Sequence, residues 1–421
     1  MSVLKFVVVV AIVTVGLFAV ACGGGGEEST VSLSESPTPE LTAAVTPSAS
    51  ATPSSTPSQD AVSLSDVAGW RVVVLRETEY RGQPGELWIS YLDGTGGRRL
   101  TGDGEVGTWA GFAGDSEGGT ETAYYIRVDG EASRSVWAVD LTSGVRSEVL
   151  SFEVLRQDWA DASVSPDGRY VAYAHVDGID VFDVVTGEYT HLLDNGPTEC
   201  DAGSCFSHSQ PRWSPSGALL MVRKTFWEGG TSIVVDPFAD PLTLHTNDSP
   251  VGPYTSTWST NDEAACGYGR YASPSGLYVA VGPGWEFENQ LPEYEEYGSA
   301  ERWVSDCSWL DEDRVVFGAN VSRRDFESDT YVPLENSVEV LVFDRRTGQE
   351  RLLHEVEGAV QIWTGKVLAL AGTDLIVTQQ FVDDAGAGSG VASRPELIDV
   401  ENGDRLAVLQ PGDELVAVIG P

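Results

Sequence analysis

Positive charge is scarce in this sequence. Its 421 residues carry 64 acidic side chains against 25 lysines and arginines, which gives a formal net charge of −39. Beyond the first 21 residues only two lysines remain, Lys224 and Lys366. A field this negative repels phosphate backbones and anionic lipid surfaces, so it argues against nucleic acid and in favour of a basic partner. Solubility of an exported protein would also explain the charge, and both interpretations stay open.

Helical periodicity is missing as well, and no familiar catalytic spacing holds up. No stretch repeats its apolar residues every three to four positions, which argues against a helical fold. Without helices, a nucleophile elbow lacks the strand-to-helix turn that it needs. His-Glu-x-x-His and Cys-x-x-Cys do not occur either, which argues against a zinc peptidase and against a thiolate zinc site. We therefore assign no catalytic residue.

The first residues resemble a bacterial lipoprotein signal peptide. One charge, Lys5, precedes the apolar stretch Phe6–Val20, which is short for a membrane span. The stretch ends in Ala-Val-Ala before Cys22, small residues followed by a cysteine that would be lipidated after cleavage. We expect 1–21 to be the signal peptide and Cys22 to anchor the protein to a bacterial membrane, outside the cytoplasm. An uncleaved membrane anchor is the alternative.

The region that follows Cys22 has the composition of a tether. Residues 27–60 are dominated by Ser, Thr and Pro and hold few large apolar side chains. Such a segment cannot bury enough surface to fold. We therefore predict a disordered linker over 22–61 and one folded domain over 62–421.

One repeat is especially clear in the folded part, over Ser163–Leu193. It opens with the turn Ser165-Pro-Asp-Gly168, contains short alternating apolar runs, and closes with the turn Asp183–Gly187. The closing Asp-x-x-polar-Gly pattern recurs at 140–144, 344–348 and 399–403. Intervals between closing turns are roughly 50 residues, apart from one of about twice that length, and this period is typical of a β-propeller.

Counting the repeats predicts an all-β, seven-bladed β-propeller, with six or eight blades as alternatives. Ser273–Gly276 and the apolar run after it supply the turn and strand missing from the doubled interval. The C-terminal run Glu414–Ile419 follows the last blade, and we expect it to complete the first blade and close the ring. We expect the protein to be a monomer.

Tryptophans recur near the first strand of the blades. We interpret them as packing between neighbouring blades; the alternative is an aromatic binding ring around the channel. They are Trp109, Trp159, Trp213, Trp258, Trp309 and Trp363.

The stretch from Ser165 to Tyr173, Ser-Pro-Asp-Gly-Arg-Tyr-Val-Ala-Tyr, resembles the WD-like repeat of TolB-type propellers. Ser214–Gly217 and Ser273–Gly276 are partial copies of its turn. The resemblance implies a propeller that serves as an extracytoplasmic interaction platform or as a non-catalytic domain. TolB-type propellers are often six-bladed, so a count of seven differs from that pattern.

The cysteine count suits an oxidising compartment. If Cys22 carries lipid, four cysteines remain. Cys200 and Cys205 close a short loop and are expected to pair, which leaves Cys266 and Cys307 for each other. A four-cysteine zinc site is the alternative, although neither pair has the usual spacing.

Two aromatic loops are candidate partner-binding surfaces. The insertion 283–303 places aromatic residues among glutamates, and the hairpin tip 226–230 places two more. Aromatic side chains on loops of a rigid scaffold are typical of contact surfaces, whereas packing on an adjacent blade is the alternative. The candidates are Phe226, Trp227, Trp285, Phe287, Tyr294 and Tyr297.

Metal sites are less strongly indicated. Carboxylates near the start of each blade could converge on the central channel and bind Ca²⁺, or they could form a solvated rim. They are Asp158, Asp161, Asp262, Asp306 and Asp311. The five histidines are scattered, and we interpret His175 and His191 as structural, although a propeller can bring distant histidines together.

These observations favour a surface-tethered, non-enzymatic propeller that binds protein or envelope polysaccharide. The alternative is a carbohydrate-active enzyme, a lyase or glycosidase that uses carboxylates in the channel.

Overall fold

The computed structural model describes most of the chain after residue 62. The described residues are 63–76, 85–102, 105, 107–114, 121–154, 161–197, 206–226, 229–240, 242–245, 255–268, 276–291, 300–325, 330–357, 366–370, 372–379, 381–383, 390–392, 394–410 and 413–421. Several expectations lie outside them, namely the signal peptide, Cys22, the linker, the pair Cys200 and Cys205, and three of the candidate aromatic residues, Trp227, Tyr294 and Tyr297. Within the described part, no helix has both the length and the apolar character needed to span a membrane.

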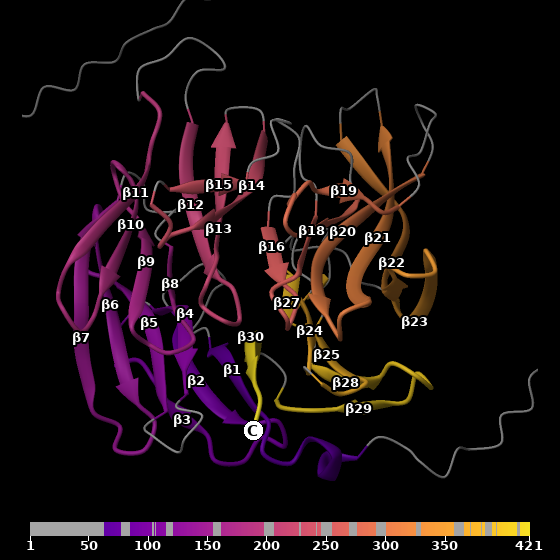
Figure 1. Ribbon diagram of the computed structural model, residues 1–421. Helices are drawn as coiled ribbons and strands as arrows, with labels where there is room; N and C mark the ends of the chain where they lie inside the picture. Colours follow the sequence, from indigo (N-terminus) through magenta and orange to yellow (C-terminus); the bar gives the residue numbers. More distant parts are fainter. Residues whose placement is uncertain are drawn as a thin grey trace, which may run out of the picture. The chain divides into compact units, whose positions relative to one another are not determined.

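Seven four-stranded antiparallel sheets make up the described part of the chain (Figure 1). Blade one contains β1 (Arg71–Arg76), β2 (Glu86–Tyr91), β3 (Arg98–Arg99) and β30 (Asp413–Ile419). Blade two contains β4 (Gly107–Ala113), β5 (Thr122–Val128), β6 (Ser133–Asp140) and β7 (Arg146–Glu153). Blade three contains β8 (Ala162–Val164), β9 (Tyr170–Ala174), β10 (Gly178–Asp183) and β11 (Tyr189–Asp194). Blade four contains β12 (Phe206–Trp213), β13 (Leu220–Phe226), β14 (Gly229–Asp236) and β15 (Thr243–His245).

The remaining blades follow the same plan. Blade five contains β16 (Thr255–Trp258), β17 (Ala264–Tyr268), β18 (Leu277–Val281) and β19 (Glu288–Asn289). Blade six contains β20 (Ala300–Trp309), β21 (Arg314–Asp325), β22 (Thr330–Asp344) and β23 (Gln349–Glu357). Blade seven contains β24 (Lys366–Ala369), β25 (Leu375–Gln379), β28 (Glu396–Asp399) and β29 (Arg405–Ala407), with the hairpin of β26 (Phe381–Asp383) and β27 (Gly390–Ala392) inserted. A single 3₁₀ turn, η1 (Leu64–Val67), precedes β1 in the described residues.

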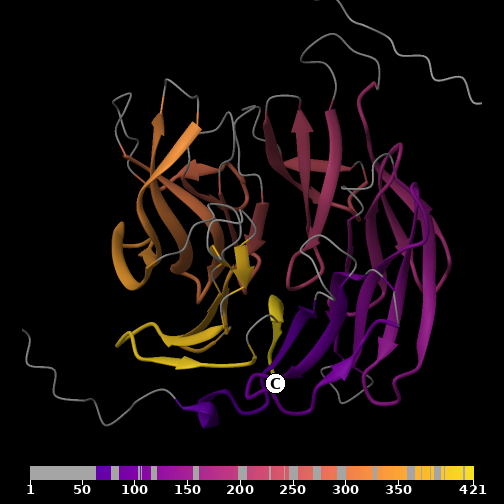
Figure 2. The same ribbon diagram turned by 180° about the vertical axis from the view of Figure 1, so that it is seen from behind.

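Together the sheets form a seven-bladed β-propeller, which confirms the predicted fold. Apolar residues of neighbouring blades gather into seven clusters among the described residues, one at each interface between blades. The two opposite views show the sheets arranged around a ring (Figures 1 and 2). Each sheet thus buries both of its faces against its neighbours, which is how short strands gain enough buried apolar area to be stable.

The ring closes where the sequence predicts it. Strand β30, from the C-terminus, pairs antiparallel with β1, with Val72 opposite Val418 and Arg76 opposite Asp413. It therefore provides the fourth strand of blade one and covers an edge that would otherwise be open. In Figure 1 the yellow β30 lies beside the indigo β1.

Tryptophans at the ends of the first strands link consecutive blades. The indole Nε1 of Trp213 donates to the carbonyl of Ser163 at 3.0 Å. Trp258 and Trp309 make the same bond one blade further on, to the carbonyls of Arg212 and Thr257 at 3.0 and 3.2 Å. These three tryptophans pack between blades, as we interpreted them.

Blade five differs from the prediction. The turn between its first two strands is Ser259–Asp262, in which Ser259 Oγ donates to Asn261 Oδ1 and accepts from the N–H of Ala264. The same serine geometry holds the turn that begins at Ser165, where Ser165 Oγ donates to Asp167 Oδ1 and accepts from the N–H of Tyr170. We took Ser273–Gly276 as a partial copy of this turn, but in blade five Ser259–Asp262 form it. Gly276 directly precedes the third strand, β18, and residues 273–275 lie outside the described residues.

Candidate functional site

The turns between the first and second strands of neighbouring blades contact one another. In blades four and five, the N–H of Ser216 donates to Asp262 Oδ1 at 3.1 Å. In blades six and seven, the guanidinium of Arg314 donates to Asp374 Oδ1 at 2.6 Å. These polar links gather the turns of consecutive blades on one face of the ring.

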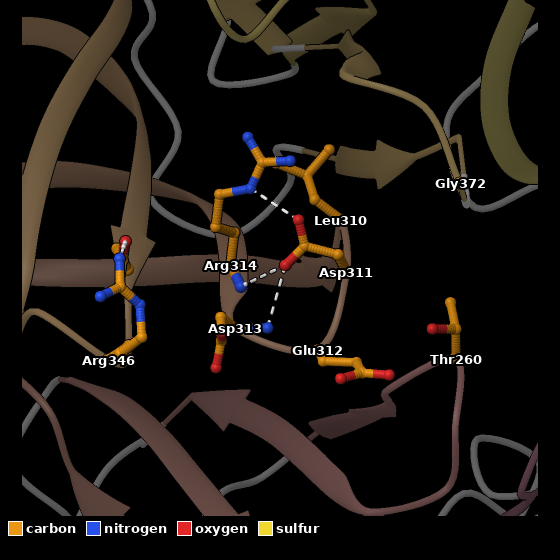
Figure 3. A pocket seen from close by; sticks show the side chains of 9 residues that line it. Thr260, Leu310, Asp311, Glu312, Asp313, Arg314, Arg346 and Gly372 are labelled. Carbon is orange, nitrogen blue, oxygen red and sulfur yellow. Dashed lines mark hydrogen bonds and ion pairs between the residues drawn. The ribbon is translucent and has the colours of Figure 1, made fainter.

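A pocket of about 510 Å³ opens among these turns (Figure 3). Its lining comes from blades five, six and seven, and consists of Thr260, Leu310, Asp311, Glu312, Asp313, Arg314, Asp344, Arg346 and Gly372. None of these nine described lining residues is aromatic. Four of them are acidic and two are arginines, so the lining is negative overall.

Arg314 organises the acidic side of the pocket. Its Nε donates to Asp311 Oδ2 at 2.6 Å, and its terminal nitrogens donate to Asp374 at 2.6 Å and to Glu401 at 2.7 Å. Burial by itself would lower the pKa of Arg314, but the hydrogen bonds to Asp374 and Asp311 outweigh it and raise the pKa. The guanidinium is therefore a permanent positive charge surrounded by three carboxylates.

Asp311 is held as a carboxylate. Burial by itself would raise its pKa, but the N–H groups of Asp313 and Arg314 and the Arg314 side chain donate to it and lower the pKa. A general acid needs the opposite environment, which keeps the proton on near neutral pH. Asp311 can therefore attract a cation, but it is a poor proton donor.

Two of the candidate partner-binding residues are buried. Trp285 is 4% exposed and Phe287 is 6% exposed, and both belong to the cluster between blades four and five. The Trp285 ring meets Trp258 edge-on, with centroids 5.1 Å apart. The expectation of exposed aromatic side chains does not hold for these two residues, because the adjacent blade covers them.

The hairpin that carries Phe226 is also packed, in part. Phe226 is partly buried, with its ring centroid 6.3 Å from that of Phe206. The Lys224 ammonium lies 4.2 Å from the Phe206 centroid and 5.3 Å from the Phe226 centroid. Phe226 is therefore one wall of a small cation–π cluster.

Three of the four described carboxylates that we expected near the channel serve different local purposes. Asp262 accepts hydrogen bonds from Ser214 and Ser216 of the preceding blade. Asp306 accepts from the N–H of Val367 at 3.2 Å, and burial raises its pKa. Asp311 belongs to the pocket, whereas Asp158 lies outside the described residues. These contacts offer no support for a calcium site at these residues.

One disulfide is present in the described part of the chain. Cys266 of β17 and Cys307 of β20 are bonded, with their Cα atoms 6.4 Å apart. The predicted pairing of these two cysteines is confirmed. The bond links blades five and six beside the pocket-forming turns.

A histidine cluster on blade three escaped the sequence reasoning. Donor atoms of His175, Asp180 and His191 all lie within 4.8 Å of one another, so these residues could hold a metal ion. Burial alone would raise the pKa of Asp180, but the contacts with the two imidazoles outweigh it and lower the pKa. A signal existed, because His191 lies on one of the strands that flank Asp180 and His175 directly follows the other.

Comparison with known proteins supports the fold and goes no further. No family model matches the sequence, and no curated protein matches it. A prolyl endopeptidase structure aligns at 13% identity over 83% of this chain and 49% of its own, with a TM-score of 0.54. An oligogalacturonate lyase in complex with manganese aligns at 13% identity over 81% of this chain and 85% of its own, with a TM-score of 0.50.

TolB from Acinetobacter baumannii is also similar in structure. It aligns at 15% identity over 68% of this chain, and the chain spans 63% of the TolB length, with a TM-score of 0.44. We base no argument about function on a similarity of this size. The protein is a β-propeller.

Proposed function

We propose that this protein is a lipid-tethered, extracytoplasmic propeller that binds a partner protein without catalysis. The pocket formed by blades five, six and seven would receive a basic group of that partner, an arginine or lysine side chain. The observation that carries this proposal is the set of four acidic side chains that line the pocket with Arg314 and Arg346. They make the lining negative overall, and one of them, Glu312, is exposed.

The lining favours a cationic protein group over a polysaccharide. Carbohydrate sites commonly offer an aromatic ring on which a sugar face can stack, and the nine described lining residues include none. Carboxylates held in place by backbone N–H groups keep their charge and position, so a cation meets a preformed site. The net charge of −39 would also speed the approach of a basic partner at low salt.

Neither Asp311 nor Asp344 has the environment of the general acid that the alternative, a lyase or glycosidase, would need. Such enzymes hold two carboxyl groups whose pKa values are pushed apart, one raised and one low. Asp311 has a lowered pKa, and so does Asp344, chiefly because the N–H of Thr347 donates to it. Both groups are therefore weak bases that stay negatively charged, which suits the binding of a cation.

Reversing the charge of Glu312 tests the proposal. The full chain would be purified in detergent from the membrane fraction, where the proposed anchor places it. A fluorescein-labelled Gly-Arg-Gly-Arg-Gly peptide serves as the probe, and its affinity is measured by anisotropy. A charge reversal about 8 Å from a bound cation costs about 1 kcal/mol at the pocket surface, so Glu312→Lys should weaken binding about fivefold.

Glu188→Lys is the matched control, because Glu188 is exposed in a turn of blade three and its substitution changes the net charge equally. It should weaken binding less than twofold. Equal losses in the two variants would assign binding to the overall field and contradict a pocket. The wild type would also be assayed for turnover of a panel of neutral and acidic oligosaccharides. Turnover that is lost in Asp311→Asn would replace the proposal with the enzymatic alternative.

A further inference from the structure

His175, Asp180 and His191 lie on one face of blade three. They are at the end of the blade opposite to the Ser165–Gly168 turn. Asp180 of β10 lies opposite Tyr173 of β9 and opposite His191 of β11. Side chains two residues apart on a strand point to the same face, so His175, which follows β9, joins Tyr173 on this side. The carboxylate on the middle strand, β10, is therefore flanked by one histidine from the β9 side and one from β11.

A β-bulge creates this arrangement. Ile179 lies opposite Leu193, but the next residue, Asp180, lies opposite His191, so Leu192 is the extra residue on β11. Without the bulge an apolar leucine would face Asp180. Bulges are a common way to re-aim a side chain, and here the bulge brings an imidazole to the carboxylate while Leu192 and Leu193 both stay buried.

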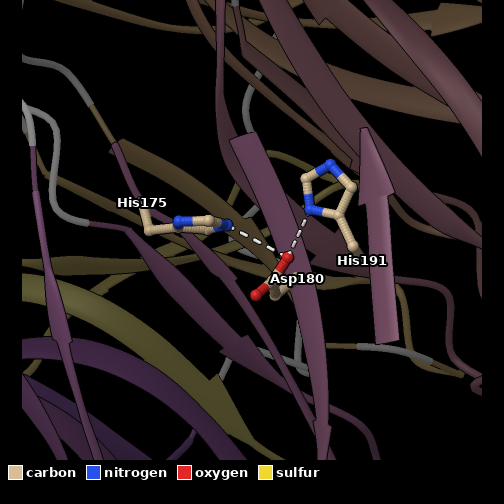
Figure 4. A group of neighbouring side chains, drawn as sticks. All are labelled: His175, Asp180 and His191. Carbon is tan, nitrogen blue, oxygen red and sulfur yellow. Dashed lines mark hydrogen bonds and ion pairs between the residues drawn. The ribbon is translucent and has the colours of Figure 1, made fainter. Parts of the chain in front are cut away.

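The two imidazoles converge on the same carboxylate oxygen (Figure 4). Nε2 of His175 lies 3.0 Å and Nδ1 of His191 lies 2.7 Å from Asp180 Oδ1. Nε2 of His175 is buried, and its contact with Asp180 lacks the alignment of a hydrogen bond. The structure therefore aims a buried ring nitrogen at a carboxylate without satisfying it through a regular hydrogen bond.

Surrounding groups hold the three side chains in place. His191 Nε2 lies 3.0 Å from Asp194 Oδ1, an outer carboxylate of the kind that orients metal-binding histidines. The phenol of Tyr173 donates to Asp180 Oδ2 at 3.2 Å. The side-chain amide of Asn195 donates to the carbonyls of His175 and Val176, which fixes the turn that carries His175.

We propose that His175, Asp180 and His191 bind one divalent transition-metal ion, with zinc as the ion that fits best. Two imidazoles and one carboxylate are the donor types that Zn²⁺ takes, whereas Ca²⁺ takes oxygen ligands only. Ligands around a tetrahedral zinc lie about 3.3 Å apart, and the three donor atoms already lie within 4.8 Å of one another. Small side-chain rotations are enough to enclose the ion.

Metal binding displaces protons from the ring nitrogens that become ligands. At His175 the remaining ring proton must then sit on Nδ1, and this opens the weak 3.4 Å contact from the N–H of Asp177. The His191 side chain is 45% exposed, so solvent reaches the ion from this side. Three protein ligands leave a position for water or for a ligand atom of another molecule.

The test uses the full chain without a histidine tag, stripped of metal and kept oxidised so that thiols do not compete. Calorimetric titration with ZnCl₂ in the presence of excess CaCl₂ should give one ion bound per chain. Co²⁺ should give the visible absorption of a four-coordinate site with nitrogen and oxygen donors. Zinc should also raise the melting temperature by a few degrees, since it binds only the folded state.

Variants separate a metal site from a structural cluster. His191→Gln should lower zinc affinity at least 100-fold, and Asp194→Asn about 10-fold through its effect on His191. His354→Gln, which removes a histidine from blade six, should leave the affinity unchanged. Because His191 is exposed, His191→Gln should melt like the wild type in EDTA, so that a lost affinity is not a lost fold.

The proposal would be overturned if folded His191→Gln kept the full zinc affinity of the wild type. It would also be overturned if the wild-type chain bound no zinc. The site lies at the opposite end of its strands from the turns that form the pocket and on a different blade. The two proposals can therefore fail independently.

Discussion

Replacing Gln379 by leucine should weaken the closure of the ring. Gln379 ends β25 of blade seven and is 1% exposed. Its amide nitrogen donates to the carbonyl of Asp413 at 2.6 Å, and its amide oxygen accepts from the N–H of Leu415 at 2.7 Å. Both partners belong to β30, so this one side chain ties the closing strand of blade one to blade seven.

The cost of the substitution can be worked from these two bonds. Leucine has nearly the same volume, so it leaves little cavity, but it leaves a buried carbonyl and a buried N–H without their bond to Gln379. Each such group costs about 1–3 kcal/mol, and we expect a total of about 3 kcal/mol. A domain of about 360 residues unfolds with an entropy near 0.75 kcal/mol/K, so the melting temperature should fall by about 4 °C.

Differential scanning calorimetry at one fixed scan rate measures this change, with urea unfolding as a second assay. Gln349→Leu is the control, because Gln349 is exposed at the start of β23 and its loss should cost less than about 0.5 kcal/mol. If Gln379→Leu melts within about 1 °C of the wild type, the two bonds do not secure the closure and the reasoning fails.

Two further predictions concern stability. Burial, helped by the charge of Lys224, lowers the pKa of His208 to about 4, whereas an unfolded histidine has a pKa near 6.5. Neutral His208 therefore contributes stability above pH ~6.5, and about 3 kcal/mol of it is lost as the pH falls from there towards 4. Urea titrations should show that the unfolding free energy of His208→Gln falls less over this pH window than that of the wild type. Parallel pH profiles of the unfolding free energy in the two proteins would count against this. The disulfide closes a loop of 41 residues, so the double variant Cys266→Ala, Cys307→Ala should lose about 4 kcal/mol. A double variant that melts with the oxidised wild type would show that the bond adds nothing.

The repeat architecture could be predicted because its signals are local. The closing turn of blade three depends on Asp183, whose Oδ1 accepts from the N–H groups of Val185 and Thr186, and on Gly187 with a φ of +74°. These contacts span five residues, so the same letters mark the same turn in other blades. The closing strand was predictable for a similar reason, since an apolar run after the last complete repeat has one edge left to pair.

The errors came from contacts between blades. Trp285 and Phe287 look like exposed loop aromatics in the sequence, but blade four covers them. The turn of blade five was missed because Ser259 and Asn261 make the required hydrogen bonds without the proline and glycine of the blade-three turn. The turns of blades three and five share the hydrogen bonds of their serine hydroxyl groups and not the Ser-Pro-Asp-Gly sequence.

By itself the sequence predicted the fold class, a count of seven blades, the closure by the C-terminal strand and the Cys266–Cys307 pairing, and the structure confirmed each. Each follows from turn chemistry, strand alternation or counting. Only the tertiary structure decided the sites. The pocket joins turns from three blades around Arg314, and the histidine cluster depends on one bulge at Leu192. Such features arise from the register and packing of strands, which no local pattern of residues specifies.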